Sequence, residues 1–119
     1  MCENMPGSVI GTSNPASPIA QEETFGPVAL ILPADDIDQA VDLANAVPHG
    51  LVSALCSNDA SARTRFAQEI QTGILKLSPG PPAISGEAPF CGWKSSAIGP
   101  PEHGIWDRHF YTRAQVVYQ

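Results

Sequence analysis

The sequence predicts an α/β fold, with a partial parallel sheet and flanking helices. Three short apolar runs, at residues 28–32, 51–56 and 74–77, alternate with two stretches of helical periodicity. Strand, helix, strand, helix, strand is typical of a parallel sheet with crossover connections. The composition agrees, because 43% of the 119 residues are hydrophobic and 15% are charged. Such a chain forms one globular domain, or a piece of a larger one, rather than a disordered segment.

The first half begins with an irregular arm, residues 1–18, which is rich in Pro, Gly, Ser and Asn and has a short extended piece near residues 8–12. The first strand follows at residues 28–32, between Pro27 and Pro33. Its continuous apolar run predicts a strand that is buried on both faces.

A helix is expected to start at Asp36. Its carboxylate can accept from the amide of Gln39 while the Gln39 side chain reaches back, as in a capping box. The stretch from Pro48 to Gly50 stops this helix. Its apolar face is formed by Ile37, Ala40, Val41, Ala44 and Val47.

The second strand is predicted at residues 51–56 and the third at 74–77. Between them Asp59 caps a helix over about residues 60–72, and Gly73 ends it. One side of that helix carries Ala62, Phe66 and Ile70.

Residues 78–101 break the pattern. Six of the twelve prolines and four of the ten glycines fall there, and a structureless stretch of this length inside a domain is usually functional. A short helix over residues 102–111 and a last strand over 112–118 complete the expected elements.

The charge is unevenly distributed. Residues 1–62 contain eight acids and no Lys or Arg, whereas residues 63–119 contain six bases and four acids. This balance argues against a nucleic-acid partner and against an anionic membrane surface. No apolar run could cross a bilayer, no signal peptide is visible, and the three cysteines have no C-x-x-C spacing. A cytoplasmic protein with reduced thiols is therefore expected.

Few residues have the surroundings that nucleophilic or metal chemistry needs. Cys56 lies in an apparent buried strand, where a cysteine is normally a small hydrophobe. Cys91, in a Gly/Pro loop next to Trp93 and Lys94, is the one thiol expected to be exposed. The three histidines lack a metal-ligand spacing, and no Gly-rich phosphate loop is present.

The segment Glu22-Glu23-Thr24-Phe25-Gly26-Pro27 directly precedes the first strand. It places a carboxylate and an aromatic ring at the mouth of a parallel sheet, where they could hold the sugar hydroxyls and the base of a nucleotide. On these six residues alone, a solvated glutamate and a core phenylalanine are the favoured explanation of the pattern.

Further motifs follow in order: Ala44-Asn45-Ala46-Val47-Pro48-His49-Gly50-Leu51, Thr72-Gly73-Ile74-Leu75, Ala88-Pro89-Phe90-Cys91-Gly92-Trp93-Lys94, and Gly99-Pro100-Pro101-Glu102-His103-Gly104. With the Glu-x-Phe-Gly-Pro segment, they resemble the NAD(P)-dependent aldehyde dehydrogenase superfamily. The likeness covers residues 19–119. It implies that residues 19–111 form the C-terminal part of an aldehyde-dehydrogenase-like catalytic domain and that residues 112–119 form a terminal oligomerisation strand.

The resemblance also implies roles for three residues. Glu23 matches the glutamate that holds the nicotinamide-ribose hydroxyls of NAD or NADP, and Phe25 matches the phenylalanine packed by the nicotinamide. Phe90 matches the aromatic residue that lines the substrate entrance. The stretch from Trp93 to His109 most resembles members that act on semialdehydes of small acids. The family has Gly at the position of Cys91, and residues 77–82 also depart from its pattern.

The family's nucleophilic cysteine, general-base glutamate and dinucleotide-binding domain lie upstream of the matching region, so the resemblance assigns no catalytic residue here. One hypothesis is a fragment of an enzyme that oxidises an aldehyde to a carboxylic acid. The alternative is a non-catalytic oligomerisation or interaction module. Its C-terminal strand would pair with a second copy or with a full-length aldehyde dehydrogenase subunit.

Overall fold

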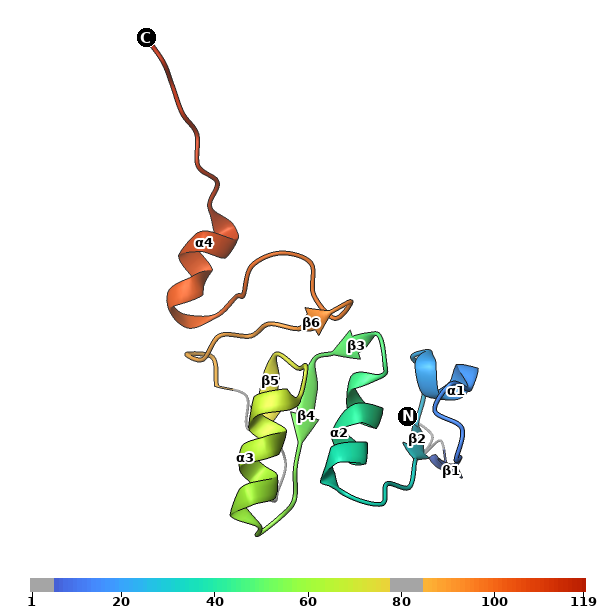
Figure 1. Cartoon of the computed structure of the whole chain (residues 1–119). Coiled ribbons are helices and arrows are strands. Elements are labelled where there is room, and N and C mark those ends of the chain that lie inside the picture. Colours follow the sequence, from blue (N-terminus) through green and yellow to red (C-terminus); the bar gives the residue numbers. More distant parts are fainter. Residues whose placement is uncertain (1–5, 78–84) are drawn as a thin grey trace. The chain divides into compact units, whose positions relative to one another are not determined.

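The computed structural model describes residues 6–77 and 85–119. The described residues form two compact units, which are divided between Pro48 and His49 (Figure 1). The first unit contains β1 (Ser8–Gly11), α1 (Pro18–Gln21), β2 (Val28–Ile31) and α2 (Ile37–Asn45). The second contains β3 (His49–Gly50), β4 (Val52–Ala54), α3 (Ala60–Glu69), β5 (Ile74–Lys76), β6 (Trp93–Lys94), a 3₁₀ turn η1 (Gly104–Trp106) and α4 (Asp107–Tyr111).

In the first unit β1 and β2 form a two-stranded parallel sheet in which Val9 pairs with Ala29 and Gly11 with Ile31. The extended piece expected near residues 8–12 of the N-terminal arm is thus present as β1. The expectation that β2 is buried on both faces is wrong. Ile31 is 58% exposed and only Leu30 is half-buried, because β2 pairs with one strand instead of lying inside a larger sheet.

The predicted start of α2 is confirmed. The Asp36 carboxylate accepts from the amide of Gln39 at 2.8 Å. The Gln39 side chain reaches back one residue further than in a capping box and accepts from the amide of Asp35. The helix ends at Asn45, before the proline, and Val41 on its apolar face is 2% exposed.

In the second unit β4 and β5 pair in parallel and are connected through α3. This β-α-β arrangement confirms the predicted order for residues 51–77. The predicted strands thus occur in two small parallel sheets, with β2 paired to β1 in the first unit and β4 paired to β5 in the second. Cys56 lies two residues beyond the end of β4 and is exposed, so the expectation that it is a buried strand residue is wrong.

The core of the second unit lies along α3. The Asp59 carboxylate caps the helix by accepting from the amides of Ser61 and Ala62. Phe66 and Ile70 are each 6% exposed, which confirms the predicted apolar side. The helix ends at Glu69, earlier than predicted, because Ile70 is already extended with φ −70° and ψ 132°.

The sequence departs from the family pattern at residues 77–82. All of these except Leu77 lie outside the described part of the chain. The short helix expected near the C-terminus is present as η1 and α4. Residues 112–118 are extended, as expected, and pair with no strand among the described residues (Figure 1), so their pairing with another chain stays a prediction. In residues 6–77 and 85–119, no helix is long and apolar enough to span a membrane.

Candidate functional site

The Glu-x-Phe-Gly-Pro turn lies between α1 and β2 in the first unit. The amide of Gly26 donates to the carbonyl of Thr24 at 2.6 Å, and the amide of Val28 donates to that of Gly26 at 2.8 Å. Pro27 is tied to β1, since its carbonyl accepts from the amide of Ser8 at 2.8 Å. The backbone of the turn is therefore fixed at its junction with the sheet.

The side chains of this turn face solvent. Glu23 is exposed and Phe25 is 93% exposed. Phe25 is therefore not a core residue of the described part of this unit. The carboxylate of Glu23 is accessible to a ligand in the same way.

Phe90 belongs to the second unit and is held by two backbone hydrogen bonds. Its amide donates to the carbonyl of Glu102 at 2.7 Å, and the amide of Glu102 donates back at 3.1 Å. The Phe90 ring lies 5.5 Å from the ring of His103 at an interplanar angle of 40°.

His103 is the residue that sequence reasoning missed at this site. Its backbone is left-handed with φ 74°, and its amide donates to the carboxylate of Asp107 at 2.6 Å. Its Nδ1 atom is buried and has no hydrogen-bond partner among residues 6–77 and 85–119. The sequence carried no signal for this arrangement beyond the Glu102-His103-Gly104 motif, because the pairing of Phe90 with Glu102 appears only in three dimensions.

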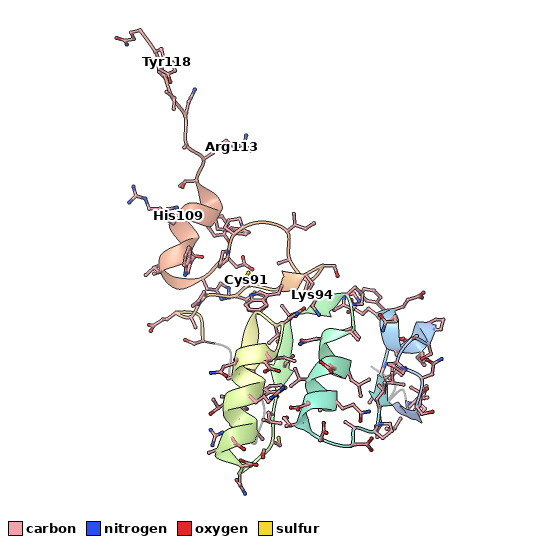
Figure 2. All side chains as sticks on the ribbon, viewed as in Figure 1. Cys91, Lys94, His109, Arg113 and Tyr118 are labelled. Atoms are coloured by element: carbon pink, nitrogen blue, oxygen red, sulfur yellow. The ribbon has the colours of Figure 1, made fainter. Side chains whose placement is uncertain are left out.

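Cys91 is half-buried next to Phe90, and its thiol donates to the carbonyl of Gly92 at 3.1 Å. Figure 2 shows Cys91 on the segment that leads to Lys94 in β6. The sequence predicted an exposed thiol at Cys91, but the residue is only partly exposed. It lines a cavity of about 200 Å³ together with Phe90, Glu102 and Phe110.

Three glycines fix the Phe90–Cys91 segment against the sheet. The amide of Gly73 donates to the carbonyl of Gly50 at 3.0 Å, and the amide of Gly50 donates to the Ser96 hydroxyl at 2.9 Å. A Cβ atom on Gly73 would lie 1.6 Å from the carbonyl oxygen of Cys91, and one on Gly92 2.5 Å from that of Ser96. Only glycine permits these backbone approaches.

The comparisons with known proteins agree with the motifs. The sequence model of the aldehyde dehydrogenase family matches residues 5–117. The likeness thus begins earlier than residue 19, from which the motifs indicated it. The α-ketoglutarate semialdehyde dehydrogenase of Haloferax volcanii is 34% identical over 106 residues, which cover 88% of this chain and 22% of that protein.

Two solved structures of aldehyde dehydrogenases are also similar to this chain. The Mycobacterium tuberculosis aldehyde dehydrogenase complexed with NAD⁺ is 34% identical, with a TM-score of 0.71 over 81% of this chain and 19% of that one. The Staphylococcus aureus betaine aldehyde dehydrogenase in complex with NAD⁺ is 32% identical, with a TM-score of 0.78 over 87% of this chain and 20% of that one. The chain spans about a fifth of the length of these relatives.

Proposed function

The chain belongs to the aldehyde dehydrogenase family, and from this premise we propose that it contributes part of the cofactor and substrate site of an NAD(P)-dependent enzyme that oxidises an aldehyde to a carboxylic acid. The observation that carries the proposal is the exposed Glu-x-Phe-Gly-Pro turn, where Glu23 and the 93% exposed Phe25 face solvent on a fixed backbone. The rest of such an enzyme would come from sequence outside the 119 residues.

The residues of the turn fit one end of the cofactor. A glutamate carboxylate can accept from both hydroxyls of a ribose, and an exposed phenyl ring can pack against a nicotinamide. The described residues contain no Gly-rich loop at a helix start for the pyrophosphate, so the fit is limited to the nicotinamide-ribose end. When bound, NAD(P) supplies the two-electron oxidation, while Glu23 and Phe25 orient it.

Phe90 supports the proposal from the second unit. Its two hydrogen bonds with Glu102 fix its backbone, and its ring lines the cavity beside Cys91. We assign to Phe90 one apolar wall of the aldehyde pocket. The relatives are named for a semialdehyde and for betaine aldehyde. Membership of the family therefore does not determine whether the aldehyde is anionic or cationic.

A chimeric enzyme would test this function. Residues 5–117 replace the matching region of the semialdehyde dehydrogenase of Haloferax volcanii, and NAD⁺ reduction is followed by absorbance with its named substrate. We expect Glu23→Gln to raise the KM for NAD⁺ by about tenfold, since a lost charged hydrogen bond costs about 1.4 kcal/mol.

Glu22→Gln is the matched control, because Glu22 is the neighbouring exposed carboxylate on the same turn. It should leave the KM unchanged. Equal effects of the two substitutions, or no effect of Glu23→Gln in an active chimera, would contradict the assignment.

A second candidate function, a non-catalytic interaction module, is favoured by the C-terminal segment. Val116, Val117 and Tyr118 are 71%, 73% and 92% exposed on an extended backbone. Figure 2 shows Arg113 and Tyr118 along this segment, beyond the helix that carries His109. Such a strand can complete the sheet of a second copy or of a full-length aldehyde dehydrogenase subunit. We also propose a cytoplasmic location, which is compatible with either function. The cysteines have no disulfide spacing, as is usual for proteins of that compartment.

A further inference from the structure

A serine and a histidine from distant parts of the sequence meet on the surface of the second unit. The Ser95 hydroxyl oxygen lies 3.3 Å from Nδ1 of His49, although 46 positions separate the two residues. The pairing of β3 with β6 explains the contact, because it places His49 opposite Lys94, the residue before Ser95. Ser95 is exposed and His49 is half-buried, so a molecule from solvent can reach the serine.

The turn that carries Ser95 is fixed on β3 by two further hydrogen bonds. The amide of Ser96 donates to the carbonyl of Trp93 at 3.0 Å, which closes a tight turn. The Ser96 hydroxyl accepts from the amide of Gly50, the neighbour of His49, at 2.9 Å. The backbone therefore holds Ser95 beside His49, and the contact between their side chains does not depend on the 3.3 Å interaction alone.

Lys94, within this turn, has an unusual backbone (Figure 2). Its φ of 52° is left-handed, which is uncommon for a residue other than glycine. Residues in such conformations cluster at active sites and ligand clamps, where the surrounding structure maintains them. The same residue brings a positive charge to the turn, which favours a reaction that develops negative charge there.

A serine hydroxyl bonded to an imidazole nitrogen is the arrangement from which activated nucleophiles are built. Nδ1 of His49 accepts from the Ser95 hydroxyl when the ring is neutral and carries its proton on Nε2. The ring can then take the hydroxyl proton while the serine oxygen attacks an electrophilic carbon. The contact thus has the chemistry of a nucleophile with its general base.

We propose that Ser95 is an acyl acceptor and that His49 is its general base. The Ser95 oxygen forms a bond to the carbonyl carbon of a small activated acyl donor, such as an ester, and its proton moves to Nδ1 of His49. The bond from that carbon to the leaving group then breaks. The leaving group departs with the bonding electrons and receives the proton from the imidazolium. The product is an acyl ester of Ser95, and nothing is oxidised or reduced.

Acetylation by 4-nitrophenyl acetate tests this chemistry on the full chain at about pH 8, where ordinary imidazoles are neutral. After partial reaction the chain is digested, and the acetylated residues are located by mass spectrometry. Ser85 is the internal reference, because it is exposed and its hydroxyl accepts from the amide of Glu87, which is not a base. We expect Ser95 to be acetylated at least about tenfold faster than Ser85, since a positioned general base accelerates such attacks.

His49→Asn separates a base from a hydrogen-bond acceptor. The asparagine amide oxygen can still accept from the Ser95 hydroxyl, but it does not take the proton. The rate at Ser95 should therefore fall to that at Ser85. His109→Asn is the matched control and should leave the rate unchanged, because the His109 ring has Trp106 as its neighbour, with centroids 6.3 Å apart. Equal losses in the two variants would contradict the role of His49.

Equal acetylation of Ser95 and Ser85, acetylation of Lys94 without Ser95, or an unchanged rate in His49→Asn would overturn the proposal. If His49→Asn does not fold, the comparison of Ser95 with Ser85 in the unmodified chain decides alone. The readout needs no cofactor and no aldehyde, so it can fail while the chimera remains sensitive to Glu23→Gln.

Discussion

At the scale of single residues, Gly73 determines whether the backbone of Cys91 can approach the start of β5. A side chain there would overlap the carbonyl of Cys91, since its Cβ would lie 1.6 Å from that oxygen. We expect Gly73→Ala to destabilise the second unit by at least about 2 kcal/mol, because backbone on both sides of the contact must move. Urea denaturation followed by the fluorescence of Trp93 and Trp106 measures the change.

Gly86→Ala is the control for this prediction. A Cβ on Gly86 meets no atom within 4 Å, so the substitution should change the unfolding free energy by no more than about 0.5 kcal/mol. If Gly73→Ala unfolded at the same urea concentration as the unmodified chain, the close approach of Gly73 and Cys91 would not exist in solution.

Asp59 is a second residue whose chemistry follows from its immediate neighbours. Hydrogen bonds from the Ser61 hydroxyl, above all, and from the amides of Ser61 and Ala62 lower the pKa of its carboxyl below the ordinary 3.8. A carboxyl with a lowered folded-state pKa stabilises the fold above its unfolded pKa, and that contribution disappears as the pH falls through the folded value. The stabilisation that the Asp59 cap gives α3 should therefore fall as the pH drops below the ordinary 3.8.

Ser61→Ala should raise the pKa of Asp59 toward 3.8, because it removes the largest of these interactions. An NMR titration of the Asp59 carboxyl carbon measures this. Ser57→Ala should not change the pKa, since the Ser57 hydroxyl accepts from the Asp59 amide and does not touch the carboxylate. Identical titration curves for the two variants would show that the Ser61 hydroxyl does not act on Asp59.

At the scale of elements, residues 112–118 are a strand without a sheet. Their backbone is extended and their apolar side chains are exposed. Exposed strand edges of this kind pair with other chains. We expect light scattering to show association that increases with protein concentration. Val117→Pro should reduce it, because proline removes an amide from the middle of the segment.

Gln119→Pro supplies the comparison, as it changes the last residue of the chain and leaves the amides of 112–118 intact. It should associate like the unmodified protein. A monomer at all concentrations, with residues 112–118 flexible by NMR, would speak against a pairing role for this element.

At the scale of the whole molecule, we expect that the 119-residue chain alone does not oxidise aldehydes. Cys56 is exposed beyond the end of β4, and the thiol of Cys91 donates to the carbonyl of Gly92. The resemblance assigns neither of them the role of the family's nucleophile. Each tenfold of rate corresponds to about 1.4 kcal/mol of barrier, so we expect these 119 residues, tested without the nucleophile, base and cofactor domain of the family, to lack most of the acceleration.

Purified chain with a panel of semialdehydes and either nicotinamide cofactor, followed by the absorbance of the reduced cofactor, checks this expectation. The rate should equal that of the buffer. Turnover above that background which disappears in Cys91→Ala would make Cys91 a nucleophile and the chain a minimal enzyme.

The sequence by itself determined the features that depend on neighbours along the chain. Asp36 and Asp59 cap their helices as predicted, because a cap needs only residues two or three positions away. The parallel pairing of β4 and β5 follows from strand-helix-strand order. The motifs around Phe25 and Phe90 likewise identified the family from residue order alone.

Only the tertiary structure decided what depends on residues distant in sequence. The exposure of β2 could not be read from its apolar run, because burial depends on which strands and helices cover it. The approach of Gly73 to Cys91 and the cavity shared by Phe90, Glu102 and Phe110 join segments many residues apart. The physical reason is that a local pattern fixes hydrogen bonds within a helix or turn, whereas burial and cavities are set by the packing of distant segments.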